Sequence, residues 1–141
     1  MNCKVNCKSA SITGVVLIVI YFLMNFLTHG VILKNIYMQN ASIWRPESEI
    51  QSLMYLMLIG EAIFAFFYAM IVAAGYDNTK PGLGQGVRFG LLMACMIAPF
   101  SALVWYVILP IPGELALYWF IADFVAMMVL GVAAGLIYKA K

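Results

Sequence analysis

Five polar side chains that could do chemistry lie inside long apolar stretches of the sequence, where burying a polar group costs free energy. They are Asn25, His29, Glu61, Ser101 and Asp123. Ionisable groups in such stretches are costly in lipid, so each one marks either an ion or proton path or a paired structural contact. Two carboxyl groups and an imidazole could bind a cation or relay protons, with His29 as the group that first meets the proton.

The sequence leaves three interpretations of this polar set open. The set could bind a cation or relay protons, or it could be a buried hydrogen-bond cluster that holds the helices in register. In a third interpretation, Glu61 or Asp123 faces a partner subunit. His29, Glu61 and Asp123 could also form a facial metal-binding set, but no His-x3-His or Glu-x2-His spacing supports one. We therefore assign no metal site.

Four apolar runs must position these side chains, and they span residues 12–33, 53–75, 87–109 and 115–138. Each run exceeds the roughly 20 residues that an α-helix needs to cross a hydrocarbon core. None alternates polar and apolar residues as a barrel strand does. Only 10% of the residues are charged, against about 25% in soluble domains. The sequence predicts one all-α domain over residues 1–141, a transmembrane four-helix bundle in the lipid bilayer.

The ends of these runs place four of the polar residues at a similar depth. Asn25 and Ser101 each lie eight residues before the end of a run, and Glu61 and Asp123 each lie eight residues after the start of one. At 1.5 Å per residue, all four lie about 12 Å below one membrane surface. His29 lies one turn nearer that surface on the helix face of Asn25. We expect one polar layer, built by four helices, in the outer half of the bundle.

Positive charges are shared unevenly between the two sides of the membrane. One side has Lys4, Lys8, Lys80, Arg88, Lys139 and Lys141, and the other has Lys34 and Arg45. The positive-inside rule therefore predicts a multi-pass protein of a bacterial-type inner membrane, with both termini and the 76–86 loop in the cytoplasm. Trp44, Trp105 and Trp119 then fall near the outer boundary, where indole rings commonly anchor a protein.

The third apolar run carries a stripe of small residues at four-residue spacing. The stripe is Gly86, Gly90, Ala94, Ala98 and Ala102. Small residues let helix backbones approach closely, so the stripe predicts a packing surface either within the chain or toward another subunit. Pro99 in the same run predicts a kink. Pro46, followed by two carboxylates, predicts the start of the second helix, and the 76–86 segment predicts a turn.

Three further segments carry a resemblance to known proteins. They are Thr28-His29-Gly30-Val31 leading on to residues 42–46, Gly86-Val87-Arg88-Phe89-Gly90, and Pro110-Ile111-Pro112 leading on to Trp119-Phe120. With them, the chain resembles small bacterial integral membrane proteins of four helices, a group with no assigned activity. The resemblance implies an architecture and no particular chemistry.

Several classes of function lack support in the sequence. No basic patch suggests nucleic-acid binding, and no Ser/His/Asp or Cys/His constellation suggests nucleophilic catalysis. His29 is the only histidine, so a bis-His haem within one chain is excluded, and we assign no cofactor. We expect a non-catalytic accessory or structural subunit of a larger membrane protein complex. The alternative is a small homo-oligomeric transporter, linked to protons or cations, that uses the polar layer. A membrane enzyme acting on lipid or quinone is a third class that no residue pattern favours.

Overall fold

The computed structural model describes residues 5–140, so Lys4 and Lys141 lie outside the described residues. The four apolar runs form four long helices. They are α1 (Cys7–Asn25), which continues into a π-helical turn η1 (Phe26–Ile32), α3 (Glu47–Gly75), α4 (Gly82–Ile108) and α5 (Gly113–Ile137). Each is long and apolar enough to cross a membrane. The predicted fold class, an all-α transmembrane four-helix bundle, is confirmed.

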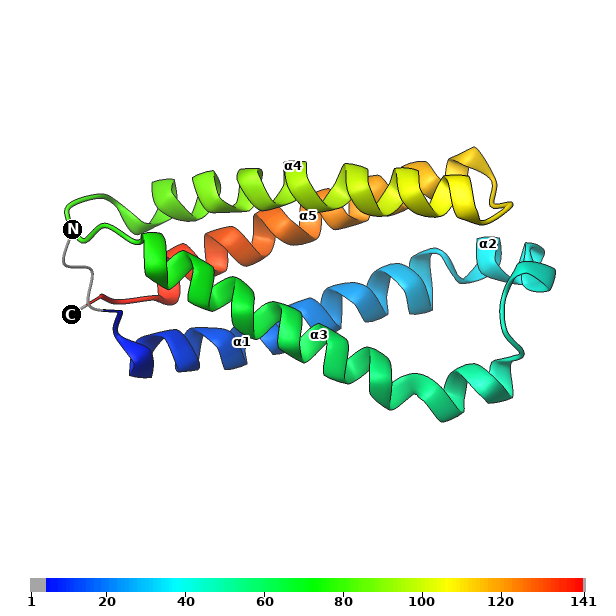
Figure 1. Ribbon diagram of the computed structural model, residues 1–141, viewed down its shortest axis with the longest axis horizontal. Helices are drawn as coiled ribbons and strands as arrows, with labels where there is room; N and C mark the ends of the chain where they lie inside the picture. Colours follow the sequence, from blue (N-terminus) through cyan, green and yellow to red (C-terminus); the bar gives the residue numbers. More distant parts are fainter. Residues whose placement is uncertain (1–4, 141) are drawn as a thin grey trace.

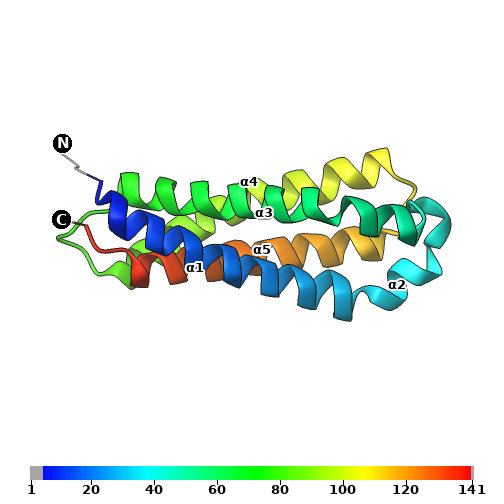
Figure 2. The ribbon, with the colours of Figure 1, turned by 90° about the horizontal axis from the view of Figure 1, so that it is seen from below.

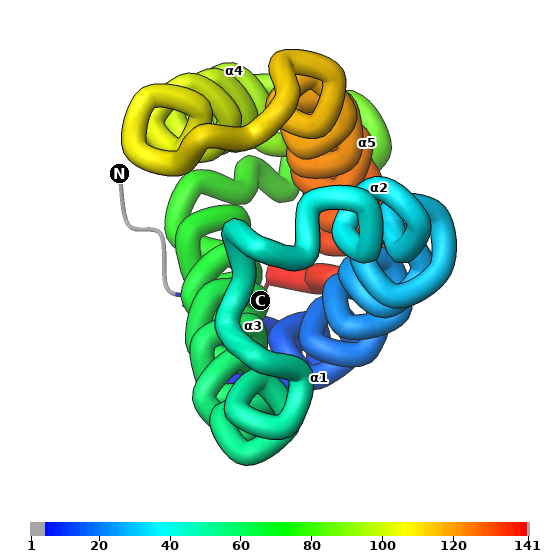
Figure 3. The backbone as a smooth tube through the Cα atoms, turned by 90° about the vertical axis from the view of Figure 1, so that its right-hand side faces the viewer, coloured from blue at the N-terminus to red at the C-terminus, as the bar shows by residue number. Residues whose placement is uncertain are grey.

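The connection between α1 and α3 contains two short helical segments. These are α2 (Lys34–Gln39) and the 3-10 turn η2 (Ala41–Ile43). Leu33, just before α2, forms a small buried cluster with Ile111 of the α4–α5 connection and Leu115 of α5. This apolar contact fixes the connection against the end of α5, and Figure 3 shows α2 lying beside α5.

The long helices begin earlier than the apolar runs, since polar and small residues form their first turns. A proline directly precedes each of the last three long helices, at Pro46, Pro81 and Pro112. Its fixed φ angle suits a helix start. The predicted turn over residues 76–86 is therefore wrong from Gly82 onward, where α4 begins. The helix α4 then runs without interruption through Pro99.

The helices run antiparallel in chain order, so the molecule has two distinct ends (Figures 1 and 2). We call the end with α2 and the α4–α5 connection the α2 end, and the opposite one the terminal end. At the terminal end, the Asn6 backbone N–H donates to Tyr138 Oη over 3.0 Å. The Lys139 N–H donates to Ser9 Oγ over 2.8 Å. These bonds join the start of α1 to the segment that follows α5.

The small-residue stripe of α4 is buried against α5. Among backbone atoms, a Cβ at Gly86 would meet the carbonyl of Gly131, and a Cβ at Gly90 would meet Met127 and Met128. Ala94, Ala98 and Ala102 continue the contact toward the α2 end, each at most 3% exposed. This α4–α5 seam is formed within one chain, so the stripe is not open to another subunit.

The bundle consists of two closely packed helix pairs, α4 with α5 and α1 with α3. Contacts of α1 and α3 with α5 join the pairs, whereas the backbones of α3 and α4 make few close contacts. In the buried core between the pairs, Tyr68 Oη of α3 donates to the Met127 carbonyl of α5 over 2.8 Å. Toward the α2 end, α3 diverges from α4 and α5 (Figures 1 and 3). Its residues 54–60 are exposed one after another, hence on every side of the helix.

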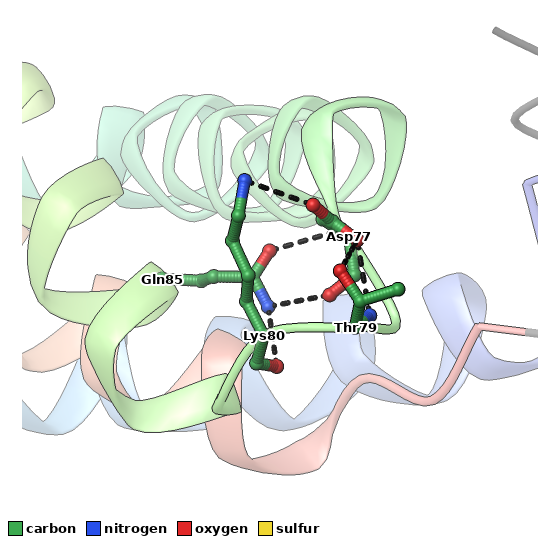
Figure 4. Close-up of polar contacts among 4 residues, drawn as sticks. All are labelled: Asp77, Thr79, Lys80 and Gln85. Carbon is green, nitrogen blue, oxygen red and sulfur yellow. Dashed lines mark hydrogen bonds and ion pairs between the residues drawn. The ribbon is translucent and has the colours of Figure 1, made fainter.

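The α3–α4 loop at the terminal end is closed by the side chain of Gln85 (Figure 4). Its Oε1 accepts from the Asp77 N–H over 2.7 Å, and its Nε2 donates to the carbonyls of Asp77 at 2.9 Å and Lys80 at 3.1 Å. The Asp77 carboxylate accepts from Lys80 and Thr79. These hydrogen bonds hold the pKa of Asp77 well below its usual range. A hydrogen-bonded turn therefore sets the direction in which α4 starts.

Candidate functional site

Asn25 and Glu61 meet across α1 and α3. Asn25 Nδ2 donates to Glu61 Oε1 over 2.9 Å. The other carboxyl oxygen, Glu61 Oε2, is buried and has no hydrogen-bond partner among residues 5–140. A buried carboxyl oxygen without a partner is costly, so this pair is only half satisfied.

Ser101 and Asp123 form the corresponding pair across α4 and α5, where the serine lies within hydrogen-bonding reach of the carboxyl group. Tyr21 of α1 lies between the two pairs. Its hydroxyl is within hydrogen-bonding reach of Asn25 and within electrostatic range of both Glu61 and Asp123. The four predicted residues therefore lie in two pairs, one in each helix pair, with Tyr21 between them.

His29 lies in the π-helical turn at the end of α1. Such turns widen a helix locally and often occur at functional sites. Its Nδ1 is hydrogen-bonded to Tyr37 Oη, which also accepts from Trp119 Nε1 over 2.8 Å. Because burial raises the pKa of Tyr37 to about 12, this hydroxyl keeps its proton at neutral pH. The tautomer of His29 decides which of the two groups donates the hydrogen that they share.

An aromatic cluster covers this hydrogen-bonded chain at the α2 end. The ring of Trp44 meets Tyr37 edge-on at a centroid distance of 5.4 Å and packs against Trp119 at 6.2 Å. Trp44 Nε1 is buried and finds no acceptor in the part of the chain that the structure describes. An indole N–H is a donor only, so this group would gain from a ligand oxygen.

A pocket of about 330 Å³ opens beside the cluster. Its lining residues are His29, Trp44, Ser101, Trp105, Leu109, Trp119 and Asp123. Its volume lies at the lower end of the range of about 300–1,000 Å³ for small-molecule sites. Three of the five predicted site residues, His29, Ser101 and Asp123, line this pocket, whereas Asn25 and Glu61 do not.

The arrangement permits some kinds of chemistry better than others. Within residues 5–140, no three His, Cys, Asp or Glu side chains gather closely enough to hold a metal ion. The facial set of His29, Glu61 and Asp123 is therefore not formed. A carboxyl group beside a hydroxyl and several indole rings can instead attract a cation or exchange a proton.

Sequence reasoning missed part of this site. Tyr37 gave no signal, because it lies in a connection without regular periodicity. The three tryptophans were interpreted as membrane anchors, although their common position near one membrane surface was visible in the sequence. That all three line one pocket follows from the way the α1–α3 connection packs on the ends of α4 and α5.

Comparisons with known proteins add no functional information, because no protein-family model, no curated protein and no solved structure matches the chain.

Proposed function

We propose that this protein is a small membrane transporter that takes up a cation or a proton through the pocket at its α2 end. The observation that carries the proposal is the position of Asp123. It is an acidic residue within a membrane-spanning helix, and it lines an open pocket beside Ser101. Intramembrane acidic residues at such positions commonly mark an ion or proton path.

The packing of the helices supports movement between two units. The α4–α5 pair is held by direct backbone contacts along the small-residue seam, and α1 packs mainly on α3. One polar pair lies inside each unit, and Tyr21 lies between the units. Transport by rocking of rigid helix groups about a fixed site is common in membrane carriers. Rocking of the two pairs would expose Asp123 to each side in turn.

The small-residue stripe no longer favours an accessory subunit, since α5 covers it within the chain. The charge distribution supports a bacterial-type inner membrane location with the terminal end in the cytoplasm. The pocket would then face outward. A reporter enzyme that is active only in the cytoplasm, fused after residue 141, tests this orientation. Activity supports it, and an inactive reporter on a correctly inserted protein contradicts it.

Flux measurements on purified protein in liposomes test the transport proposal. We expect proton or cation flux above that of protein-free liposomes, and Asp123→Asn should reduce it by about tenfold or more, as loss of a buried charge partner does. Glu61→Gln should reduce it too. The matched control is Glu114→Gln, since Glu114 is an exposed carboxylate on the same α5 helix, bonded only to Tyr118 among described residues. Flux that Asp123→Asn and Glu61→Gln leave unchanged contradicts the proposal.

A second candidate function is a non-catalytic subunit of a larger membrane assembly. The specific observation in its favour is α3, which exposes residues 54–60 on every side near the α2 end. A neighbouring membrane subunit, or a second copy in a homo-oligomer, would cover these side chains. Native mass spectrometry from a mild detergent tests this function. A fixed partner supports it, and a lone, stable monomer that transports ions contradicts it.

A further inference from the structure

The pocket at the α2 end gathers all the tryptophans of the chain. The sequence contains three, and Trp44, Trp105 and Trp119 all line the pocket together with Asp123. Indole rings attract cations more strongly than other aromatic side chains, and aromatic pockets recognise alkylated ammonium groups. A carboxyl group among three indoles therefore favours a cation with an apolar surface.

Inorganic cations fit this lining less well. Calcium takes six to eight oxygen ligands, and magnesium needs a near-ideal octahedron. The pocket lining supplies the Asp123 carboxyl and the Ser101 hydroxyl as side-chain oxygens, while four of its seven lining side chains are indoles or Leu109. An alkylated ammonium group needs no full shell of oxygen ligands, because its carbon substituents surround the charged nitrogen.

The unpaired Trp44 N–H indicates a second feature of the ligand. Trp44 lines the pocket, and its Nε1 is buried with no acceptor among residues 5–140. A buried donor without a partner is destabilising. A ligand oxygen, such as a hydroxyl or phosphate oxygen close to the ammonium group, would satisfy it.

We propose that the pocket binds a small molecule that carries an ammonium group. The ammonium group lies beside Asp123 and against the indole rings, and an oxygen atom of the molecule accepts from the Trp44 N–H. The inference deepens the proposed transport function by naming its substrate class, although binding itself can be measured without transport. The same chemistry occurs in free choline-like solutes and in the headgroups of zwitterionic lipids. The small volume of the pocket admits either a free solute or one headgroup.

Intrinsic tryptophan fluorescence reports on this site alone, since every tryptophan lines the pocket. The full chain, purified in a maltoside detergent without ammonium groups, is titrated with choline and with 3,3-dimethyl-1-butanol, its neutral isostere. We expect a saturable change with choline and binding of the isostere weaker by about tenfold or more, because it lacks both the charge and the cation–π attraction. Equal affinities for the two, or no saturable change with choline, would overturn the inference.

Two variants separate the parts of the site. Asp123→Asn should weaken choline binding by about tenfold or more, whereas Glu114→Gln on the same helix should leave it unchanged. Trp44→Phe should weaken binding of choline more than that of tetramethylammonium, which has no oxygen to accept the lost N–H. Choline binding unaffected by Asp123→Asn overturns the inference. Should Asp123→Asn fail to fold, the comparison of choline with its neutral isostere on the wild-type protein still decides.

Lipid arms distinguish the two sources of the ligand. Short-chain phosphatidylcholine that competes with choline, while short-chain phosphatidylglycerol does not, identifies a lipid headgroup and supports the inference. Choline binding without competition by either lipid identifies a free solute and supports it equally. Equal competition by both lipids overturns it. Flux of protons or inorganic cations with no preference for ammonium compounds contradicts this inference and leaves the proposed function standing. Choline binding without any flux supports this inference and contradicts the proposed transport function.

Discussion

Substitution of Gly131 by alanine should push α4 and α5 slightly apart and so destabilise the protein. A Cβ at this position would lie 2.5 Å from both the Gly86 carbonyl oxygen and the Gly90 amide nitrogen, where ordinary contacts begin at 3.4 Å. Both neighbours are backbone atoms, so neither can rotate away as a flexible side chain could. The two helices must therefore move apart by about 0.9 Å along this seam, the difference between those two distances.

The energetic consequence follows from the loss of this close packing. Overfilling a tight contact typically costs about 1–3 kcal/mol. For a chain of this size, each kcal/mol lowers the melting temperature by about 3 °C. We expect Gly131→Ala to lower the midpoint by roughly 3–9 °C. Gly90→Ala should have a smaller effect, because its Cβ would meet the Met127 carbonyl at 3.1 Å.

The matched control is Gly84→Ala, which adds the same methyl group to α4 where no heavy atom lies within 4 Å. Alanine favours a helix by up to about 1 kcal/mol over glycine, so this variant should be as stable as the wild type or slightly more stable. The assay heats the protein in mild detergent and measures the monodisperse fraction by size-exclusion chromatography. Equal midpoints for Gly131→Ala and Gly84→Ala would refute direct backbone packing between α4 and α5.

Other groups give further predictions. Because burial raises the pKa of Tyr37 to about 12, the difference in near-ultraviolet tyrosinate absorbance between the wild type and Tyr37→Phe should appear near pH 12. Between pH 10 and 12 the folded state keeps a proton that the unfolded state releases, so Tyr37 lowers stability as the pH rises; a transition near pH 10 contradicts this. Gln85→Ala should lower the free energy of unfolding by about 1–3 kcal/mol and speed proteolysis of the loop that Gln85 closes. Gln51→Ala, at an exposed position of α3, should do neither. Hydrogen bonds from groups such as Lys80 lower the pKa of Asp77 in the folded state. The ionised Asp77 should therefore stabilise the fold fully above its ordinary pKa of about 4, and this stabilisation should fade as the pH falls below that value. Melting temperatures measured over a series of acidic pH values should show this loss of stability in the wild type and not in Asp77→Asn. The same pH profile for both proteins contradicts it.

The fold was largely predictable from hydropathy, because the apolar runs must be helices to satisfy their backbone groups in lipid. Hydropathy alone did not give the helix starts, since the first turns lie outside those runs; Pro46 and the two carboxylates after it did predict the start of α3. Residues 82–86 illustrate the reason. Their glycines suggest a loop, but Pro81 fixes the chain before them, and Gly82 and Gly86 pack directly against the backbone of Gly135 and Gly131. Tertiary contact there overrides local preference.

The common level of Asn25 and Glu61 along the bundle was predictable, but the pairing of the polar residues was not. Counting from the ends of the apolar runs placed Asn25 and Glu61 at one level, and they are hydrogen-bonded. Which helices are neighbours decides the rest, and α1 packs on α3 while α4 packs on α5. The π-helical turn at His29 and the fold of the connection around Tyr37 depend on that packing as well. No periodicity in the sequence encodes either of them.

The most direct measurement is a crystal structure of the full chain grown with tetramethylarsonium, the arsenic analogue of tetramethylammonium. Anomalous scattering from arsenic would locate the cation without relying on its shape. We predict one peak inside the pocket, beside the Asp123 carboxyl group and among Trp44, Trp105 and Trp119. An empty pocket at saturating concentration, or a peak found only elsewhere on the protein, would contradict a cation site at the α2 end.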